Sequence, residues 1–161
     1  AEATRGPGRS RDAQPDLLAM NLMQTILTVR TPGAGLHEFT SDVAHFVRES
    51  GAQQGLLTLF VQHTSCSLLI QENADPDVRR DLDEFFGRLV PPADDQSMHW
   101  VRHDAEGTDD MPGHIKAALT ATSLSIPVMH GRLALGQWQG LDLFEHRPRT
   151  HVRRVVLHLS G

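Results

Sequence analysis

Hydrophobic and polar positions divide the chain into short segments of two kinds. Leu22–Arg30 is rich in β-branched residues and ends at a Thr-Pro-Gly turn signal, which predicts a first strand. Gly55–Val61 is almost continuously apolar, which predicts a central strand buried on both faces. Ser67–Gln71 is a second apolar run, and we expect it to pair antiparallel with the strand before it.

Three other segments repeat their apolar residues at helical spacing. The first ends at Gly51, a residue typical of helix stops. The second begins at Asp75, which caps it, with Pro76 at its first helical position. The third is a short helix capped by Asp109 or Asp110. We therefore expect about three helices.

The last third of the chain alternates apolar runs with turns. It predicts strands at residues 125–128, 132–135, 141–146 and 152–159. About three helices among about seven strands, joined late in the chain by short hairpins, indicate an α+β fold. Its sheet should be largely antiparallel and sandwich-like.

Length and composition limit the classes of protein to consider. The chain has 161 residues, enough for one domain with a core. Residues 1–15 are polar and turn-forming, so we expect a flexible tail before a single domain at 16–161. A net charge of −5 gives no reason to expect nucleic acid or an anionic membrane as partner. No apolar run reaches the roughly 20 residues of a membrane helix, and a lone cysteine favours the cytoplasm.

Ten histidines are the unusual feature of the composition, and four of them lie near the ends of predicted elements. His63 ends a strand, His103 lies beside Asp104 in a long irregular segment, His114 is in the first turn of the third helix, and His146 ends a strand. Three imidazole ligands with one open position are typical of catalytic zinc. The spacing is long-range, so an ordinary structural role remains the alternative for each histidine.

Other polar side chains near these histidines offer further chemistry. Glu145 precedes His146, and on a strand the two side chains point to opposite faces. Glu145 is a candidate general base, with an exposed carboxylate as the alternative. Thr64 and Ser65 are candidates for binding phosphate together with a helix N-terminus, with turn formation as the alternative. Cys66 is expected to be buried and inert.

Three long blocks carry a resemblance to a known family. They are QHTSCSLLIQENADPDVRRD at 62–81, HDAEGTDDMPGHIKAALTATSLSIPV at 103–128 and GRLALGQWQGLDLFEHR at 131–147. Together they resemble the YjbQ family, also described as secondary thiamine-phosphate synthase. The resemblance implies a YjbQ-like α+β fold, a homotrimer and a bound divalent metal or anion. It also implies a weak ability to join a pyrimidine methyl diphosphate to a thiazole phosphate, releasing diphosphate.

We therefore predict a cytoplasmic, metal-dependent, thiamine-phosphate synthase-like transferase that acts on a small phosphorylated substrate. The alternative is a non-catalytic metal- or phosphate-binding trimeric module. The predicted site has ligands for a zinc or magnesium ion, catalytic residues and phosphate-binding residues. The predicted metal ligands are His63, His114 and His146. The predicted catalytic residues are His103, Asp104 and Glu145. The predicted phosphate-binding residues are Thr64 and Ser65.

Overall fold

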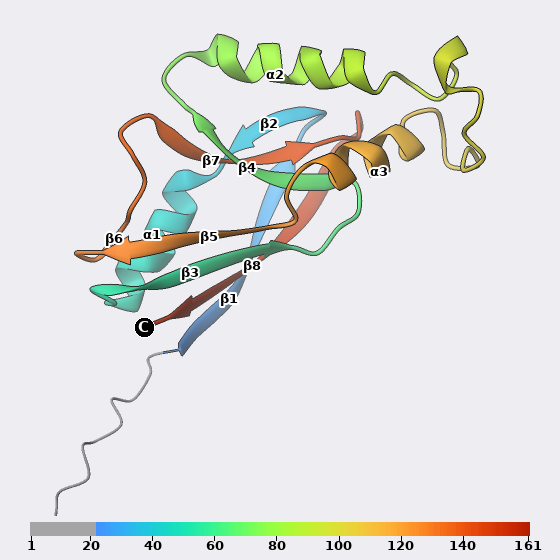
Figure 1. Cartoon of the computed structure of the whole chain (residues 1–161). Coiled ribbons are helices and arrows are strands. Elements are labelled where there is room, and N and C mark those ends of the chain that lie inside the picture. Colours follow the sequence, from blue (N-terminus) through green and yellow to red (C-terminus); the bar gives the residue numbers. More distant parts are fainter. Residues whose placement is uncertain (1–21) are drawn as a thin grey trace, which may run out of the picture.

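The computed structural model describes residues 22–161, so the tail expected at residues 1–15 lies outside the described part. Two stacked sheets form the body of the molecule, with helices around them (Figure 1). In chain order the elements are β1 (Leu22–Thr31), β2 (Gly35–Glu38), α1 (Thr40–Ser50), β3 (Gln54–Val61), β4 (Cys66–Glu72), α2 (Pro76–Leu89), the 3₁₀ turn η1 (Gln96–Met98), α3 (Asp110–Leu119), β5 (Ser123–Met129), β6 (Arg132–Leu133), β7 (Gln139–Glu145) and β8 (His151–Ser160).

The two sheets have the strand orders β1-β8-β3-β5-β6 and β2-β7-β4, and their strand pairs are antiparallel. The hydrophobic core lies between them, where Leu57 and Leu59 of β3 and Leu143 of β7 are fully buried. Three helices with these sheets confirm the predicted α+β, largely antiparallel fold. Within residues 22–161, no helix is both long enough and apolar enough to span a bilayer.

The predicted pairing of Ser67–Gln71 with the strand before it is wrong. β3 pairs with β8 and β5, whereas β4 pairs with β7 in the other sheet. The segment between them, residues 62–65, carries the chain from one sheet to the other and does not form a hairpin. This crossing places His63 and its neighbours at the junction of the two sheets.

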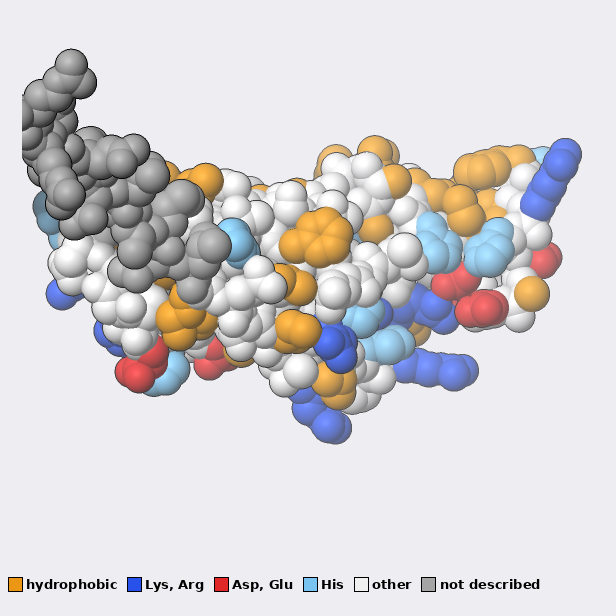
Figure 2. Space-filling view, turned by 90° about the horizontal axis from the view of Figure 1, so that it is seen from below, with side chains coloured by type: hydrophobic (Ala, Val, Ile, Leu, Met, Phe, Trp, Pro, Cys, Tyr) orange, Lys and Arg blue, Asp and Glu red, His pale blue; other side chains and the backbone are white. Residues whose placement is uncertain are grey.

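The predicted burial of β3 on both faces is also wrong, because its burial alternates along the strand. Leu57 and Leu59 point into the core, but Leu56 is 43% exposed and Phe60 is 49% exposed. Figure 2, which looks at the molecule from the side of β1, β3 and β8, shows hydrophobic side chains at the surface among polar ones. The apolar run therefore combines a core face with an exposed apolar face.

Helix ends follow the predicted signals in part. The Asp75 carboxylate accepts a hydrogen bond from the Asp77 amide at 2.9 Å, and Pro76 is the first residue of α2. Gly51 ends α1 in the left-handed conformation, with φ +69°. At the start of α3, however, Asp109 makes no side-chain capping hydrogen bond. Its carboxylate binds Arg147 instead, which ties α3 to the segment after β7.

Candidate metal centre

The helix α3 places two potential ligands on one face. Asp110 and His114 are four residues apart, the spacing that makes side chains neighbours on a helix. Asp110 is only 3% exposed, which is rare for a carboxylate. His103 reaches the same place from the segment before α3, with its Nε2 2.7 Å from Asp110 Oδ2. The His114 Nε2 lies 3.4 Å from that same oxygen, and one ligand atom from each residue lies within 4.8 Å of the others.

The protonation of His114 is set by its backbone partner. Its Nδ1 lies 3.1 Å from the carbonyl oxygen of Thr64, which can only accept a hydrogen bond. Nδ1 therefore carries a proton, and in the neutral ring the lone pair is on Nε2. A hydrogen bond from the far ring nitrogen to a carbonyl is the usual arrangement behind a metal-binding histidine. Thr64 thus orients His114 through its backbone.

Arg147 holds the other side of the acidic pair. Its Nη1 donates to Asp110 Oδ1, and its Nε donates to Asp109 Oδ2. A guanidinium spanning two carboxylates fixes the orientation of both, since its donors lie in one rigid plane. Asp110 can therefore direct Oδ2 towards the two histidines while Oδ1 stays neutralised.

An open groove of about 240 Å³ adjoins His114, with His63, Thr64 and Thr122 among its lining residues. The His63 Nε2 accepts a hydrogen bond from the backbone amide of Arg154 at 2.8 Å, so its ring proton is on Nδ1. Burial, followed by nearby positive charge, lowers the pKa of His63 and favours the neutral ring. Figure 2 shows histidine side chains beside carboxylates and cationic groups towards one end of the molecule. The groove therefore offers a neutral imidazole and hydroxyls to a ligand next to His114.

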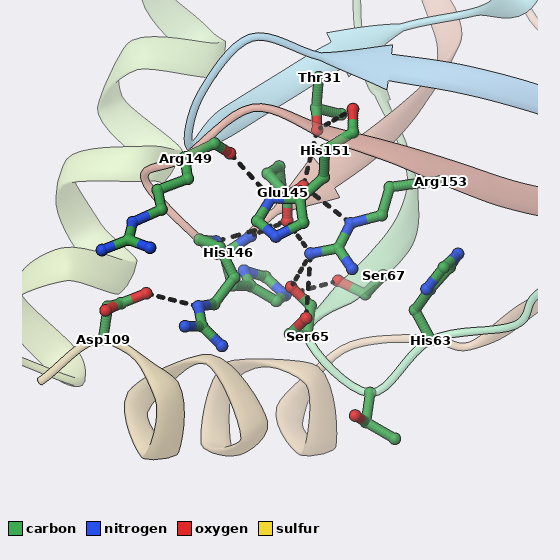
Figure 3. Close-up of polar contacts among 12 residues, drawn as sticks. Thr31, His63, Ser65, Ser67, Asp109, Glu145, His146, Arg149, His151 and Arg153 are labelled. Atoms are coloured by element: carbon green, nitrogen blue, oxygen red, sulfur yellow. Dashed lines mark hydrogen bonds and ion pairs between the residues drawn. The ribbon is translucent and has the colours of Figure 1, made fainter. Parts of the chain in front are cut away.

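Glu145 lies at the centre of a buried polar network (Figure 3). It accepts hydrogen bonds from Thr31 Oγ1 at 2.6 Å and from Arg153 Nε at 2.8 Å. Burial raises the pKa of Glu145, but the hydrogen bonds from Arg153 and Thr31 outweigh it, and the net shift is downward. With no exposed surface, Glu145 is placed to hold Arg153, and Arg153 Nη2 donates in turn to Ser65 Oγ at 2.9 Å.

His146 directly follows the last residue of β7 and is 4% exposed. Its Nε2 is 3.0 Å from Ser67 Oγ. Burial, followed by the charge of Lys116, lowers the pKa of His146 to about 3, so the ring is neutral. In Figure 3, His63 is set apart from His146. Of the three histidines predicted to bind metal, the group found among the described residues contains only His114.

The remaining predicted residues fall in different surroundings. His103, predicted to be catalytic, belongs to the candidate metal-binding group, whereas Asp104 next to it is exposed. Thr64 contributes its backbone to His114, and Cys66 is buried with its pKa raised to about 12 by burial. Asp110, expected only as a helix cap, is the member of this candidate metal-binding group that was not predicted from the sequence. The Asp-x-x-x-His spacing from Asp110 was the available signal.

Fold and site together define an antiparallel, two-sheet α+β protein in which His103 converges with Asp110 and His114 of its third helix. The family model described as UPF0047 protein YjbQ-like matches residues 25–161. The UPF0047 protein sll1880 of Synechocystis sp. is 54% identical over 138 residues, which cover 86% of this chain and 91% of the relative. The protein YjbQ of Escherichia coli O157:H7 is 42% identical over 139 residues, covering 86% and 97%. The chain belongs to the UPF0047, YjbQ-like family, which confirms the resemblance.

Solved structures agree with this assignment. A conserved hypothetical protein from Thermus thermophilus superposes with a TM-score of 0.70 at 38% identity, covering 82% of this chain and 97% of that one. A YjbQ/UPF0047 family protein from Clostridium acetobutylicum gives a TM-score of 0.73 at 31% identity, covering 84% and 98%. The chain therefore shares its fold with both of these proteins.

Proposed function

We propose that this protein is a metal-dependent enzyme that acts on phosphorylated small molecules. The observation that carries the proposal is the convergence of His103 and His114 on one oxygen of the buried Asp110. Two imidazoles and a carboxylate leave an open coordination position, as in catalytic zinc centres. Two nitrogen ligands also favour zinc over magnesium, which prefers oxygen.

The spacing of the three ligand atoms suits such an ion. Atoms at 2.0–2.1 Å from a tetrahedral metal lie roughly 3.3 Å from one another. The His114–Asp110 separation of 3.4 Å already has this value. The His103–Asp110 separation of 2.7 Å must lengthen, and the side chain of His103 is 54% exposed, so it has room to move.

Other residues of the chain would orient the metal ligands and contact the substrate. A bound ion would supply Lewis-acid charge to a phosphoryl oxygen or to water. Arg147 pairs with Asp110 and orients it, and the Thr64 carbonyl keeps the His114 proton on Nδ1. Across the groove, the Nδ1–H of His63 is a neutral hydrogen-bond donor for a substrate oxygen.

Activity against a panel of phosphorylated metabolites, with and without added zinc or magnesium, tests this proposal. We expect turnover to require metal and to fall by at least about 100-fold in His114→Ala, because a ligand of the Lewis acid is lost. His45→Ala, an exposed histidine on α1, is the matched control and should retain activity. Equal activity in His114→Ala and His45→Ala would exclude the role of the metal centre.

Thiamine phosphate formation is the specific reaction that we propose to assay first. It is supported by the family resemblance, and by the need of a diphosphate leaving group for positive charge. Purified protein with saturating metal should make thiamine phosphate from pyrimidine methyl diphosphate and thiazole phosphate at a low rate. A complete lack of product would remove this reaction and leave the panel to identify another substrate.

We also propose that the protein assembles as a homotrimer. Ile26, Val156 and Phe60 lie side by side on the outer face of the five-stranded sheet, and Ile26 and Phe60 are 45% and 49% exposed. Apolar residues grouped on a sheet face favour burial against another protein surface. Light scattering should give three times the 17.8 kDa chain mass, and Phe60→Ser should reduce it. A monomer at micromolar concentration would contradict this assembly.

A further inference from the structure

Residues 62–65 lie outside the strands and carry the chain from one sheet to the other. A segment without a ladder of strand hydrogen bonds depends on other contacts for its position. The Thr64 carbonyl in this segment accepts the hydrogen bond from His114 Nδ1 at 3.1 Å. The contacts that hold the segment therefore also set the tautomer and the orientation of His114.

Two residues near the start of β8 hold this segment on both sides of Thr64. On one side, the Arg154 amide donates to His63 Nε2 at 2.8 Å. On the other side, Arg153 Nη2 donates to Ser65 Oγ at 2.9 Å and lies 3.4 Å from the Ser65 carbonyl oxygen. Because Thr64 lies between the two anchored residues, the direction of its carbonyl depends on both.

The Arg153 side chain is itself fixed by a buried ion pair (Figure 3). Arg153 is 5% exposed, and its Nε and Nη2 donate to the two oxygens of the fully buried Glu145. Thr31 Oγ1 donates to the same carboxylate at 2.6 Å. A planar guanidinium bound to both oxygens of one carboxylate has little freedom to turn. Its Nη2 is thus directed at Ser65 by the interior of the protein.

The helix α3 packs against Ser65 one residue before His114. A Cβ on Gly113 would lie 3.7 Å from the Cβ of Ser65 and 3.6 Å from that of His146, which is van der Waals distance. The His146 amide also donates to the Ser65 carbonyl at 3.2 Å. Ser65 therefore connects the buried ion pair, the end of β7 and the helix that carries a metal ligand.

We propose that the Glu145–Arg153 pair positions His114 for metal binding. The pair acts through Ser65, which keeps the Thr64 carbonyl on His114 Nδ1 and so leaves Nε2 free for a metal. The inference rests on the proposed function, because it assigns these residues a role in metal binding. It gives Glu145 a role that needs no contact with substrate, in keeping with its full burial. Partners behind metal-binding histidines change metal affinity by about 10- to 100-fold.

Calorimetric titration of zinc into the full chain, freed of metal by a chelator, tests this role in Ser65→Ala. The variant removes the hydroxyl that Arg153 binds and leaves the ion pair with Glu145 in place. We expect zinc affinity to fall by about tenfold. Ser67→Ala removes a neighbouring buried hydroxyl, which lies 3.0 Å from His146 Nε2, and should bind zinc like wild type.

Nitrogen NMR of the metal-free protein separates positioning from a purely structural role. The His114 ring should carry its proton on Nδ1 in wild type, whereas Ser65→Ala should populate both neutral tautomers. A loss of stability alone would change neither this ratio nor the zinc affinity of the folded chain. The double variant Glu145→Gln/Arg153→Met leaves no unpaired buried charge and should shift the tautomers in the same direction.

The outcomes distinguish the positioning role from the metal centre itself. An unchanged His114 tautomer and unchanged zinc affinity in Ser65→Ala would overturn the positioning role. Equal losses of zinc affinity in Ser65→Ala and Ser67→Ala would also overturn it, since the effect would not come from the Arg153 contact. Failure of wild type to bind zinc would contradict the proposed metal centre instead, and the tautomer comparison would still decide whether His114 is positioned in this way.

Discussion

Asp110 shows what can be learned about the site from single residues. An aspartate at a helix start is normally a cap, and the prediction of a cap left out the role as a metal ligand that we propose for Asp110. Its partner Arg147 is 37 residues further along the chain and reaches it only because the end of β7 packs beside α3. The sequence therefore identifies His103 and His114 as candidates, whereas their convergence on Asp110 requires the fold.

Glu145 carries a prediction about stability. Glu145→Ala leaves the Arg153 guanidinium buried without its carboxylate, and we expect the free energy of unfolding to fall by about 3–5 kcal/mol. Glu84→Ala, which breaks the exposed Glu84–Arg88 pair on α2, should cost less than about 0.5 kcal/mol. Urea denaturation measures both. A loss below about 1 kcal/mol for Glu145→Ala would show that this network is not structural.

Asp142 carries a prediction about pH. It is fully buried, both of its oxygens lack hydrogen bonds, and burial raises its pKa to about 6, partly offset by Arg79. The folded state thus binds the proton more tightly than the unfolded state does, and stability falls as pH rises from about 4 to about 6. The shift from 3.8 to about 6 corresponds to about 3 kcal/mol.

The variant Asp142→Asn removes this titration. We expect its stability relative to wild type to rise between pH 4 and pH 7, by up to about 3 kcal/mol. Urea denaturation across that range provides the measurement. Parallel stability curves for the two proteins would show that Asp142 is not the group responsible.

At the scale of elements, helix limits were easier to predict than strand partners. The cap at Asp75 and the stop at Gly51 are local signals, and both lie where the sequence indicated. The partner of Ser67–Gln71 depends on where residues 62–65 lead the chain, and that segment has no Gly or Pro to define a turn. A local pattern identifies a strand but does not assign it to one of two sheets.

Two glycines test how tightly the elements pack. A Cβ on Gly140 of β7 would lie 2.7 Å from Glu38 Oε2 and 2.9 Å from the Cβ of Asn73. Gly140→Ala should therefore destabilise the protein by about 1–3 kcal/mol. A Cβ on Gly87 in α2 meets nothing within 4 Å, so Gly87→Ala should stabilise it by about 0.5–1 kcal/mol. Thermal unfolding should give shifts of opposite sign, and shifts of the same sign would contradict the packing at β7.

At the scale of the whole molecule, the fold class could be predicted from the sequence, because apolar alternation indicates strands and capping residues indicate helices. The division into two sheets was not, because residues such as Leu56 and Phe60 are apolar yet exposed. When a chain buries part of its surface against other copies, its apolar runs predict more burial than a single copy shows. The homotrimer that we propose accounts for this excess.

Calorimetric titration of zinc into metal-free protein tests the central claim most directly. The wild-type chain should bind one ion, with affinity reduced at least about tenfold in Asp110→Asn, because the amide cannot replace the ionised ligand. Asp104→Asn, which changes an exposed carboxylate beside His103, should bind zinc like wild type. Zinc binding of equal affinity in wild type and Asp110→Asn, or no binding to wild type, would contradict a metal centre at His103, Asp110 and His114.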